Sequence, residues 1–353
     1  MPSGTRDLRR LGLTLTFLIL LITEIVSAAE IVDRQLAVKA IQHSDYGLRY
    51  LRSKQANDGS WADSTLHTAL ALRAFLESYQ GYNEDDGAFI TRPVNFLLSL
   101  TNADGSIGRR SDNLPLTTAL AVSALQATHN PNHQATIKAA QQFLLSQSTT
   151  LDAVNKGFLN VGGQHPTSRT ITDLNDLVLV AEALNLSGLA GDASFWEATT
   201  MACQQSLQQF EKPANQSGEP DTNLALSLPH LIVLGLTYAG AGNETASLKQ
   251  ALIQVDKYYQ PEALGQPEIS PEFNLLNVAT KSLRASRQPA VKSTTGESHI
   301  WRTDLINVLL EQYNADGSFT PASEEYLKEP NRILATAWAI NTLNQIVHSF
   351  RDK

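Results

Sequence analysis

The chain has very little cysteine: Cys203 is the only one among its 353 residues. A single thiol excludes an internal disulfide and a zinc site built on several cysteines. It also excludes attachment of a lipid to a cysteine near the start of the chain. We expect Cys203 to be a small buried hydrophobic residue rather than a nucleophile.

Basic and aromatic residues are scarce as well. Lysine and arginine number 27 against 35 aspartates and glutamates, the formal charge is −8, and no basic cluster stands out. Nucleic acid is therefore not an expected partner, because phosphate binding needs a basic face. Aromatic residues make up 7% of the chain, and the apolar-polar alternation typical of strands is rare. Alanine, leucine, glutamine and threonine dominate instead, which predicts an all-α protein.

Long hydrophobic runs are missing except at the start of the chain, where residues 11–22 are apolar. Three arginines precede this run, and Val26, Ser27 and Ala28 supply the small residues of a cleavage site, a pattern typical of a signal peptide. We expect a signal peptide over residues 1–28 and export to a periplasmic or extracellular space. An uncleaved anchor is the alternative and would hold the protein near a membrane, although Glu24 makes a permanent span costly.

The rest of the chain, residues 29–353, is expected to form one domain built from repeats. NDGSW at 57–61 recurs as NADGSI at 102–107 and as NADGSF at 314–319. A helix of one type follows each copy and recurs at Asp173, and two weaker relatives of it begin at Thr222 and Glu272. The six segments begin at Ser64, Leu114, Asp173, Thr222, Glu272 and Arg332. Self-similarity at intervals of this size indicates a repeat architecture.

A second amphipathic helix precedes each of these segments. The six preceding helices are expected at 37–54, 90–100, 137–146, 196–210, 248–258 and 300–313. They carry polar residues on one face, whereas the segments that follow them are apolar on nearly every side, so the former belong outside and the latter inside. A single hairpin cannot bury both faces of its apolar helix, so the hairpins must stack. Six stacked hairpins can close into a ring.

The recurring DGS turn has a structural task in this arrangement. Its glycine ends the outer helix with a positive φ, and the next hydrophobic residue packs back onto the hairpin. We expect Gln55 to satisfy unpaired backbone groups of a neighbouring helix with its side-chain amide. The motif positions are Gln55, Asp58, Gly59, Trp61, Asp104, Gly105, Gln312, Asp316, Gly317 and Phe319.

The first copy resembles the QW repeat of squalene-hopene cyclases and related terpenoid cyclases, with its aromatic, aliphatic, glutamine, glycine and tryptophan positions filled. Those positions are Tyr50, Leu51, Gln55, Gly59 and Trp61. In the second copy Thr101 and Ile107 replace glutamine and tryptophan, and the last copy nearly keeps the pattern. The resemblance implies an (α/α)6 toroid, the fold that these cyclases share with protein prenyltransferase β subunits. It also implies a site in the central cavity, at the mouth formed by the N-terminal ends of the inner helices.

The segment TDLNDLVLVAEAL, which begins at Thr172, resembles the DxDD box of class II terpenoid cyclases. Asp173 and Asp176 match the outer two aspartates, and Asn175 replaces the middle one, which is the proton donor in that family. Because an amide cannot protonate an alkene, the replacement argues against proton-initiated cyclisation. Asp173 is also a good N-cap, and capping alone would explain its presence.

Other side chains are candidates for the same rim. His67 and Arg332 lie near the starts of the first and last inner segments, and Trp338 could form part of an apolar wall or of the core. His165 and Arg169 belong to a glycine-rich loop that directly precedes the third inner segment. Protein prenyltransferase β subunits bind zinc through an aspartate two residues from a cysteine, but Cys203 follows Met201 and Ala202, so the resemblance implies no zinc site here. No cofactor is expected either.

Three classes of function fit these patterns. The leading hypothesis is an exported, terpenoid-cyclase-like protein that holds an apolar or amphipathic molecule, isoprenoid or lipid-like, in its central cavity. An active enzyme on an isoprenoid or a polysaccharide is the first alternative. A non-catalytic scaffold for an unknown protein partner is the second.

Overall fold

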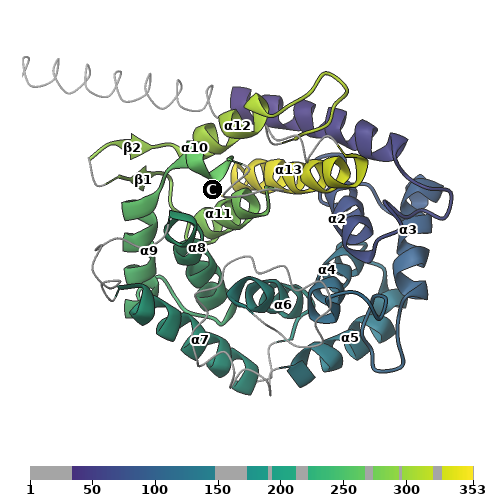
Figure 1. The fold of residues 1–353 in the computed structure, drawn as a ribbon, viewed down its shortest axis with the longest axis horizontal. Coiled ribbons are helices and arrows are strands. Elements are labelled where there is room, and N and C mark those ends of the chain that lie inside the picture. Colours follow the sequence, from purple (N-terminus) through teal and green to yellow (C-terminus); the bar gives the residue numbers. More distant parts are fainter. Residues whose placement is uncertain are drawn as a thin grey trace, which may run out of the picture.

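The computed structural model describes residues 34–147, 173–189, 193–211, 222–266, 273–293, 296–320 and 328–352. Helices form almost all regular structure in these ranges, which confirms the all-α prediction (Figure 1). The strands described are a short antiparallel pair, β1 (Val291–Lys292) and β2 (Ser298–His299). None of the helices in the described ranges has the length and hydrophobicity needed to cross a membrane. The expected signal peptide, residues 1–28, lies outside these ranges.

Six helices form a closed inner ring. In chain order they are α2 (Thr65–Leu76), α4 (Leu114–Ala127), α6 (Leu174–Leu186), α8 (Thr222–Tyr238), α11 (Asn274–Ala285) and α13 (Glu329–Ser349). Each packs against the next one, and α13 packs against α2 (Figure 1). This arrangement confirms the (α/α)6 toroid.

An outer layer of helices surrounds this ring. It consists of the N-terminal helix (residues 34–53), α3 (Ala88–Ser99), α5 (Gln134–Ser146), α7 (Ala193–Glu211), α9 (Ala246–Tyr258) and α12 (Trp301–Glu311). Three short elements lie in connections: η1 (Glu84–Asp86), η2 (Pro131–His133) and α10 (Pro261–Leu264). Burial separates the two layers, because every residue of α2 from Thr68 to Leu76 is buried, whereas α9 buries one stripe formed by Leu248, Ala251 and Val255.

The three DGS turns share one geometry. Their glycines have φ angles of 91°, 86° and 90°, and each turn aspartate accepts hydrogen bonds from the backbone N–H and hydroxyl of the following serine. A side chain at Gly59 would lie 2.4 Å from the backbone of α3, and one at Gly317 would lie 2.6 Å from the carbonyl oxygen of Tyr46. Each turn therefore packs directly on the next outer helix. At Gly317 this contact joins the last repeat to the first.

The hydrophobic residue after each DGS turn is sealed into the ring. Trp61, Ile107 and Phe319 have no exposed surface. Their backbone N–H groups donate to the hydroxyls of threonines in the N-terminal parts of α2, α4 and α13, over 2.9 to 3.0 Å. The acceptors are Thr68, Thr118 and Thr336. These hydrogen bonds fix the outer helix of each hairpin to its inner partner without leaving a buried donor unpaired.

Gln55 connects the first hairpin to the second. Its amide nitrogen donates to the carbonyl oxygens of Gly59, at 3.1 Å, and Phe89, at 3.0 Å. In a helix the carbonyl of Phe89 would accept from the residue four positions later, but that residue is Pro93, which has no N–H. The glutamine thus supplies the donor that the proline removes.

The structure places Tyr313, not Gln312, at the position of Gln55. Equivalent positions are set by the hydrogen bonds that close the turns, in which Ala56 and Asn314 donate to Ser60 and Ser318. The residue before Asn314 is Tyr313, so Gln312 lies one position too early. The last turn needs no such amide, because it packs on the N-terminal helix beside Gly47, which keeps its N–H.

Candidate functional site

The two acids of the DxDD-like segment lie together at the start of α6. Asp173 is the N-cap, and its carboxylate accepts a hydrogen bond from the backbone N–H of Asp176 over 2.8 Å. The carboxylate of Asp176 accepts from the side-chain amide of Asn113, the N-cap of α4, over 3.0 Å. Both acids are almost fully buried, with 5% and 4% of their surface exposed. The pair therefore joins the N-terminal ends of two adjacent inner helices.

Burial changes the protonation of this pair. Burial and, after it, the charge of Asp176 raise the pKa of Asp173 to about 7, while hydrogen bonds from the backbone of Asp176 and Asn175 act in the opposite direction. Two buried carboxyls this close are difficult to ionise together. Near neutral pH the pair therefore holds a proton for part of the time and can both donate and accept hydrogen bonds.

His67 lies at the N-terminal end of α2, where it connects the first repeat to the last. Its Nδ1 lies 2.9 Å from the hydroxyl of Ser64, and its Nε2 lies 3.1 Å from the carbonyl oxygen of Pro330 in α13. Burial lowers the pKa of His67. Because the carbonyl of Pro330 can only accept, the neutral ring carries its proton on Nε2 and accepts from Ser64.

Arg332 is engaged with the last DGS turn. Its guanidinium lies 2.5 Å from Asp316 and 2.9 Å from the hydroxyl of Ser318, and it stacks over the ring of Tyr50. Trp338 is buried in α13, with 7% of its surface exposed. His165 and Arg169 lie outside the described residues. The structure thus joins Asp173 to Asp176, while His67 and Arg332 have partners of their own in the first and last repeats.

A second charged cluster crosses the ring deeper inside. The carboxylate of Glu182 lies 2.8 Å from Nη2 of Arg73 and 2.7 Å from Nζ of Lys281. Nε of Arg73 also contacts Glu77, at 2.6 Å. Arg73, Glu182 and Lys281 are 4 to 8% exposed. We call these three residues the central triad.

The central triad joins helices that are not neighbours. Arg73 is on α2, Glu182 on α6 and Lys281 on α11, and one inner helix lies between each pair of them in the ring (Figure 1). Three alternate helices of a ring can bring their side chains together only across its centre. The triad therefore closes the central space at this level.

Mutual charge compensation keeps the triad ionised. Burial alone would raise the pKa of Glu182, but the charges of Arg73 and Lys281 outweigh it and bring the pKa to about 2. Burial lowers the pKa of Lys281, and the charge of Glu182 partly restores it. Such a buried cluster is stable only as a complete set, because removal of one member leaves an unpaired charge.

The sequence contains a signal for the triad that motif analysis passed over. Each member stands nine residues after the first residue of its inner segment, namely Ser64, Asp173 and Glu272. Charges of both signs at one register position of otherwise apolar helices indicate that these helices face one another there. The signal appears only when the repeats are compared at a fixed position.

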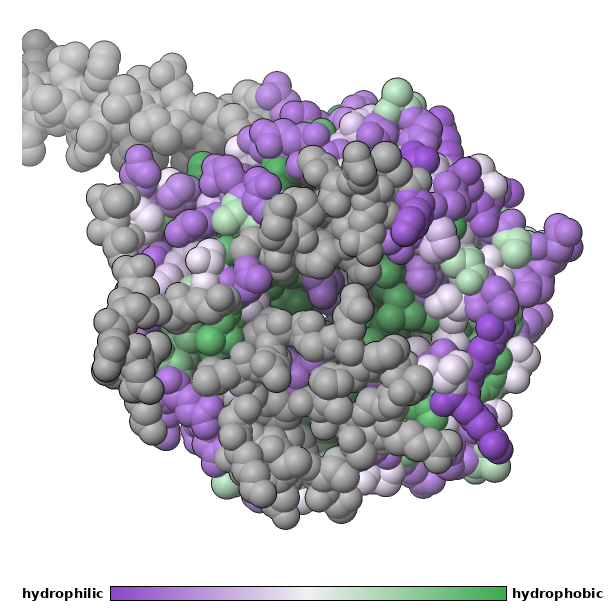
Figure 2. All heavy atoms as spheres, viewed as in Figure 1, coloured by the Kyte–Doolittle hydropathy of each residue, from purple (hydrophilic) through white to green (hydrophobic). Residues whose placement is uncertain are grey.

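Apolar side chains separate the triad from the rim. One turn nearer the N-terminal ends, on the same helix faces, stand Leu70, Leu179 and Val278. Leu179 and Val278 keep 7% and 6% of their surface exposed inside the ring, more than most of the core. Hydrophobic residues are also visible in the hollow at the centre of the face shown in Figure 2, between the parts drawn in grey. The central space is thus apolar between two polar levels.

Comparison with known proteins supports the fold. No family model matches the chain, and no curated protein matches it. Among solved structures, a single-residue variant of the type II terpene cyclase MstE from Scytonema matches with a TM-score of 0.52 and 15% identity, over 90% of this chain and 99% of the cyclase. MstE without that change matches with a TM-score of 0.50 and 14% identity, over 88% and 99%. The chain therefore has a terpenoid-cyclase-like all-α fold.

Proposed function

We propose that the protein is exported and holds an apolar or amphipathic molecule, isoprenoid or lipid-like, in the centre of its ring. The bound molecule occupies the space between the buried acid pair and the central triad. The order of these levels supports the proposal most directly: polar groups at the N-terminal rim, apolar walls below them, and charges that close the far end. A ligand with one polar end and an apolar body matches this order.

Each level has its own task in binding. The apolar walls remove the body of the ligand from water, at about 25 cal/mol for each Å² buried. The acid pair offers both a donor and an acceptor to the polar end, because it shares a proton near neutral pH. The N-terminal ends of α4 and α6 add partial positive charge at the same place. The triad limits how deep the chain of the ligand can reach.

Cyclisation started by a proton is not part of this proposal. Asn175 stands where the DxDD box has its proton-donating aspartate. Asp173, which could replace it, already caps α6 with its carboxylate. These residues support binding rather than turnover.

One observation favours an active enzyme as a second candidate. Burial gives Asp173 a pKa of about 7, in the range of acids that donate protons in catalysis. If Asp173 is such an acid, Asp173→Asn abolishes conversion of an isoprenyl substrate but leaves its binding within about threefold, because asparagine still caps the helix. A substrate that returns unchanged from incubation with the unmodified protein would remove this candidate.

Binding can be tested with a fluorescent isoprenyl chain and two matched variants. Leu179→Phe fills the apolar level, whereas Ile253→Phe makes the same kind of change at an exposed position of α9. We expect the first variant to weaken binding at least tenfold and the second to leave it unchanged, with both variants folded by circular dichroism. Equal affinities in the two variants would contradict the proposed site.

Export and natural occupancy can be tested on protein purified without detergent from its own compartment. The intact mass should correspond to residues 29–353, and lipid extraction should recover an isoprenoid or a lipid in a ratio near one per chain. An intact mass that includes residues 1–28 would support the uncleaved anchor instead.

A further inference from the structure

One face of each inner helix can be followed from the central triad back to the N-terminal rim. Arg73, Glu182 and Lys281 meet at the centre, and a residue seven positions earlier lies on the same face of its helix. On α6 and α11 these earlier residues are Asn175 and Asn274. Each is partly exposed, although the residues directly before and after it are buried. Two amides therefore face the central space at the rim.

The side-chain amide of Asn175 makes no hydrogen bond with the described part of the chain. The two acids beside it are already engaged, because Asp173 caps α6 and Asp176 accepts a hydrogen bond from Asn113. An amide has two N–H donors and a carbonyl acceptor. Asn175 is thus able to bind a polar group that enters the central space.

Trp338 lies on the opposite side of the same space. It belongs to α13, which faces α6 because two inner helices separate them in either direction around the ring (Figure 1). Trp338 stands six residues after Arg332, at the position that Leu179 holds in its own segment. Long side chains of a helix lean toward its N-terminal end, so the indole ring is directed toward the level of Asn175.

The indole N–H of Trp338 lacks an acceptor among the described residues. Trp61 and Trp301 show the usual arrangement, since each donates to a backbone carbonyl over 2.7 Å. Trp338 has only 7% of its surface exposed, yet its nitrogen donates to no described residue and is not sealed inside the core. Buried polar groups rarely stay unpaired. The acceptor for this donor must therefore come from a molecule in the central space.

Neither sign of charge is favoured in the space between the rim and the triad. At the positions that face this space, the described cations are Arg73 and Lys281, and both contact Glu182. The buried acid pair disfavours an anion at the rim. The partial positive charge of the helix N-terminal ends disfavours a cation there. An uncharged polar group is what these surroundings accept.

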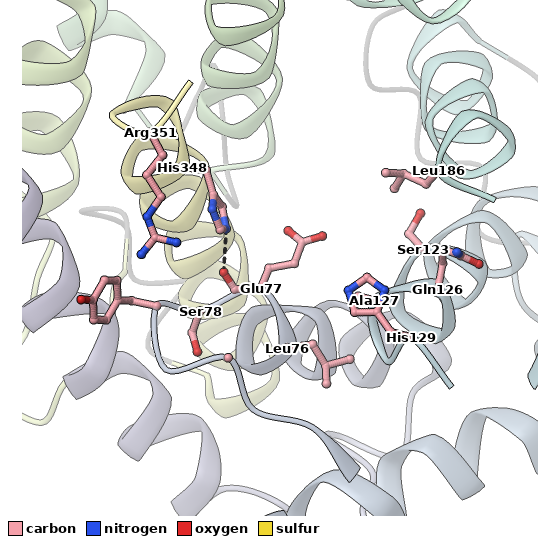
Figure 3. A pocket seen from close by; sticks show the side chains of 12 residues that line it. Leu76, Glu77, Ser78, Ser123, Gln126, Ala127, His129, Leu186, His348 and Arg351 are labelled. Atoms are coloured by element: carbon pink, nitrogen blue, oxygen red, sulfur yellow. Dashed lines mark hydrogen bonds between the residues drawn. The ribbon is translucent and has the colours of Figure 1, made fainter. Parts of the chain in front are cut away.

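Other charged groups gather beyond the triad. A cavity of about 430 Å³ lies where α2, α4, α6 and α13 end, and Glu77, His348 and Arg351 are part of its lining (Figure 3). Arg73 of the triad stands about one turn nearer the rim than Glu77. The triad therefore separates these groups from the space that Asn175 and Trp338 face.

We propose that Asn175 and Trp338 make the central site specific for a ligand whose polar end is uncharged and carries an acceptor oxygen, as in an isoprenoid alcohol. The amide of Asn175 binds this oxygen at the rim, and the indole N–H of Trp338 donates to it from the opposite wall. This inference rests on the proposed function, because it concerns the same site.

Three probes that share one isoprenyl chain test the preference: farnesol, farnesene and farnesyl diphosphate. Each competes with the fluorescent isoprenyl chain for the full-length protein. Farnesol should displace the fluorescent chain at a concentration at least fivefold lower than either of the others, since it alone is uncharged and carries an acceptor oxygen. Displacement by farnesene or by the diphosphate at the same or a lower concentration would overturn the proposal.

Three variants assign the preference to its residues. Asn175→Leu and Trp338→Phe remove the polar groups but keep apolar side chains in their places, so each should reduce the preference for farnesol over farnesene at least threefold. Asn185→Leu, the same change at an exposed position of α6, should leave the preference as it is. A purely structural role of Asn175 or Trp338 would weaken both probes equally, which would contradict the inference.

The outcome also separates this inference from the proposed function. If the fluorescent chain does not bind to the unmodified protein, the proposed function fails and the inference fails with it. If the chain binds but the preference for farnesol is the same in all variants, only the inference fails.

Discussion

At the scale of single residues, the acid pair and the central triad respond to burial in opposite ways. Among the described residues no cation acts on Asp173, so burial favours its neutral form and raises its pKa. Glu182 is buried just as completely, but two cations contact it and lower its pKa. Whether the pKa of a buried acid rises or falls therefore depends on how many opposite charges contact it, and burial alone does not decide the direction.

This difference predicts how Asp173 affects stability. Its pKa rises from 3.8 to about 7 on folding, so its contribution to stability is fully present below pH 3.8 and is lost as the pH rises through 7. Asp173→Asn keeps the cap and removes this loss, so the variant should be more stable than the unmodified protein at pH 8, by at most about 4 kcal/mol. The advantage should shrink at pH 5. Urea unfolding at both values measures it, with Asp85→Asn at an exposed position as the control.

The central triad predicts a non-additive set of variants. Glu182→Gln leaves the buried Lys281 without a counter-charge and Arg73 with Glu77 alone, and it should lower the free energy of unfolding by about 3 to 5 kcal/mol. The triple replacement Arg73→Met, Glu182→Leu and Lys281→Met removes all three charges and should lose much less. Equal losses in the single and triple variants, measured by urea unfolding at pH 7, would show that the triad does not act as one set.

At the scale of helices, residues far apart in the repeat compensate for one another. Pro93 in α3 leaves the carbonyl of Phe89 without its helical donor, and Gln55 in the DGS turn of the first repeat supplies one. The sequence could predict that Gln55 bonds to a neighbouring helix. It could not identify the partner, because nothing local shows which proline a turn will face.

The Gln55–Pro93 relation predicts a measurable coupling. Gln55→Ala should cost about 1 kcal/mol, because the partly buried carbonyl of Phe89 loses its donor. In a Pro93→Ala background the helix provides its own N–H, so the same change should cost clearly less. A double-mutant cycle by chemical unfolding gives the coupling energy, and a value near zero would mean that the amide is not needed for this carbonyl.

At the scale of the whole molecule, the last turn seals the ring. Gly317 has a φ of 90° and lies against the carbonyl of Tyr46, so Gly317→Ala has both backbone strain and a steric clash. Gly240 is the matched control, since its φ is 85° but nothing lies within 4 Å of an added Cβ. Gly317→Ala should be less stable than Gly240→Ala by about 2 kcal/mol or more. Thermal unfolding of both variants checks this. Equal losses of stability in the two variants would show that the contact between Gly317 and the backbone of Tyr46 can shift to accommodate a side chain.

Much of the architecture could be predicted from the sequence, because repetition multiplies weak signals. The six apolar segments and the DGS turns were sufficient for the ring and its two layers. The candidate site was less predictable. The DxDD-like motif predicts that Asp173 and Asp176 belong to the site. The contact of Asp176 with Asn113, and the contacts of Glu182 with Arg73 and Lys281, join side chains of different repeats. Sequence patterns within one helix carry no information on such contacts.

The contact between Gly317 and the N-terminal helix also limits how this chain can evolve and fold. An open repeat array tolerates the loss or gain of a unit, because its two ends are already capped. Here each hairpin has a neighbour on both sides, so deletion of one would expose two apolar flanks at once. Folding, too, can finish only after the last helix has been synthesised, because α2 in the first hairpin packs against α13 in the last one.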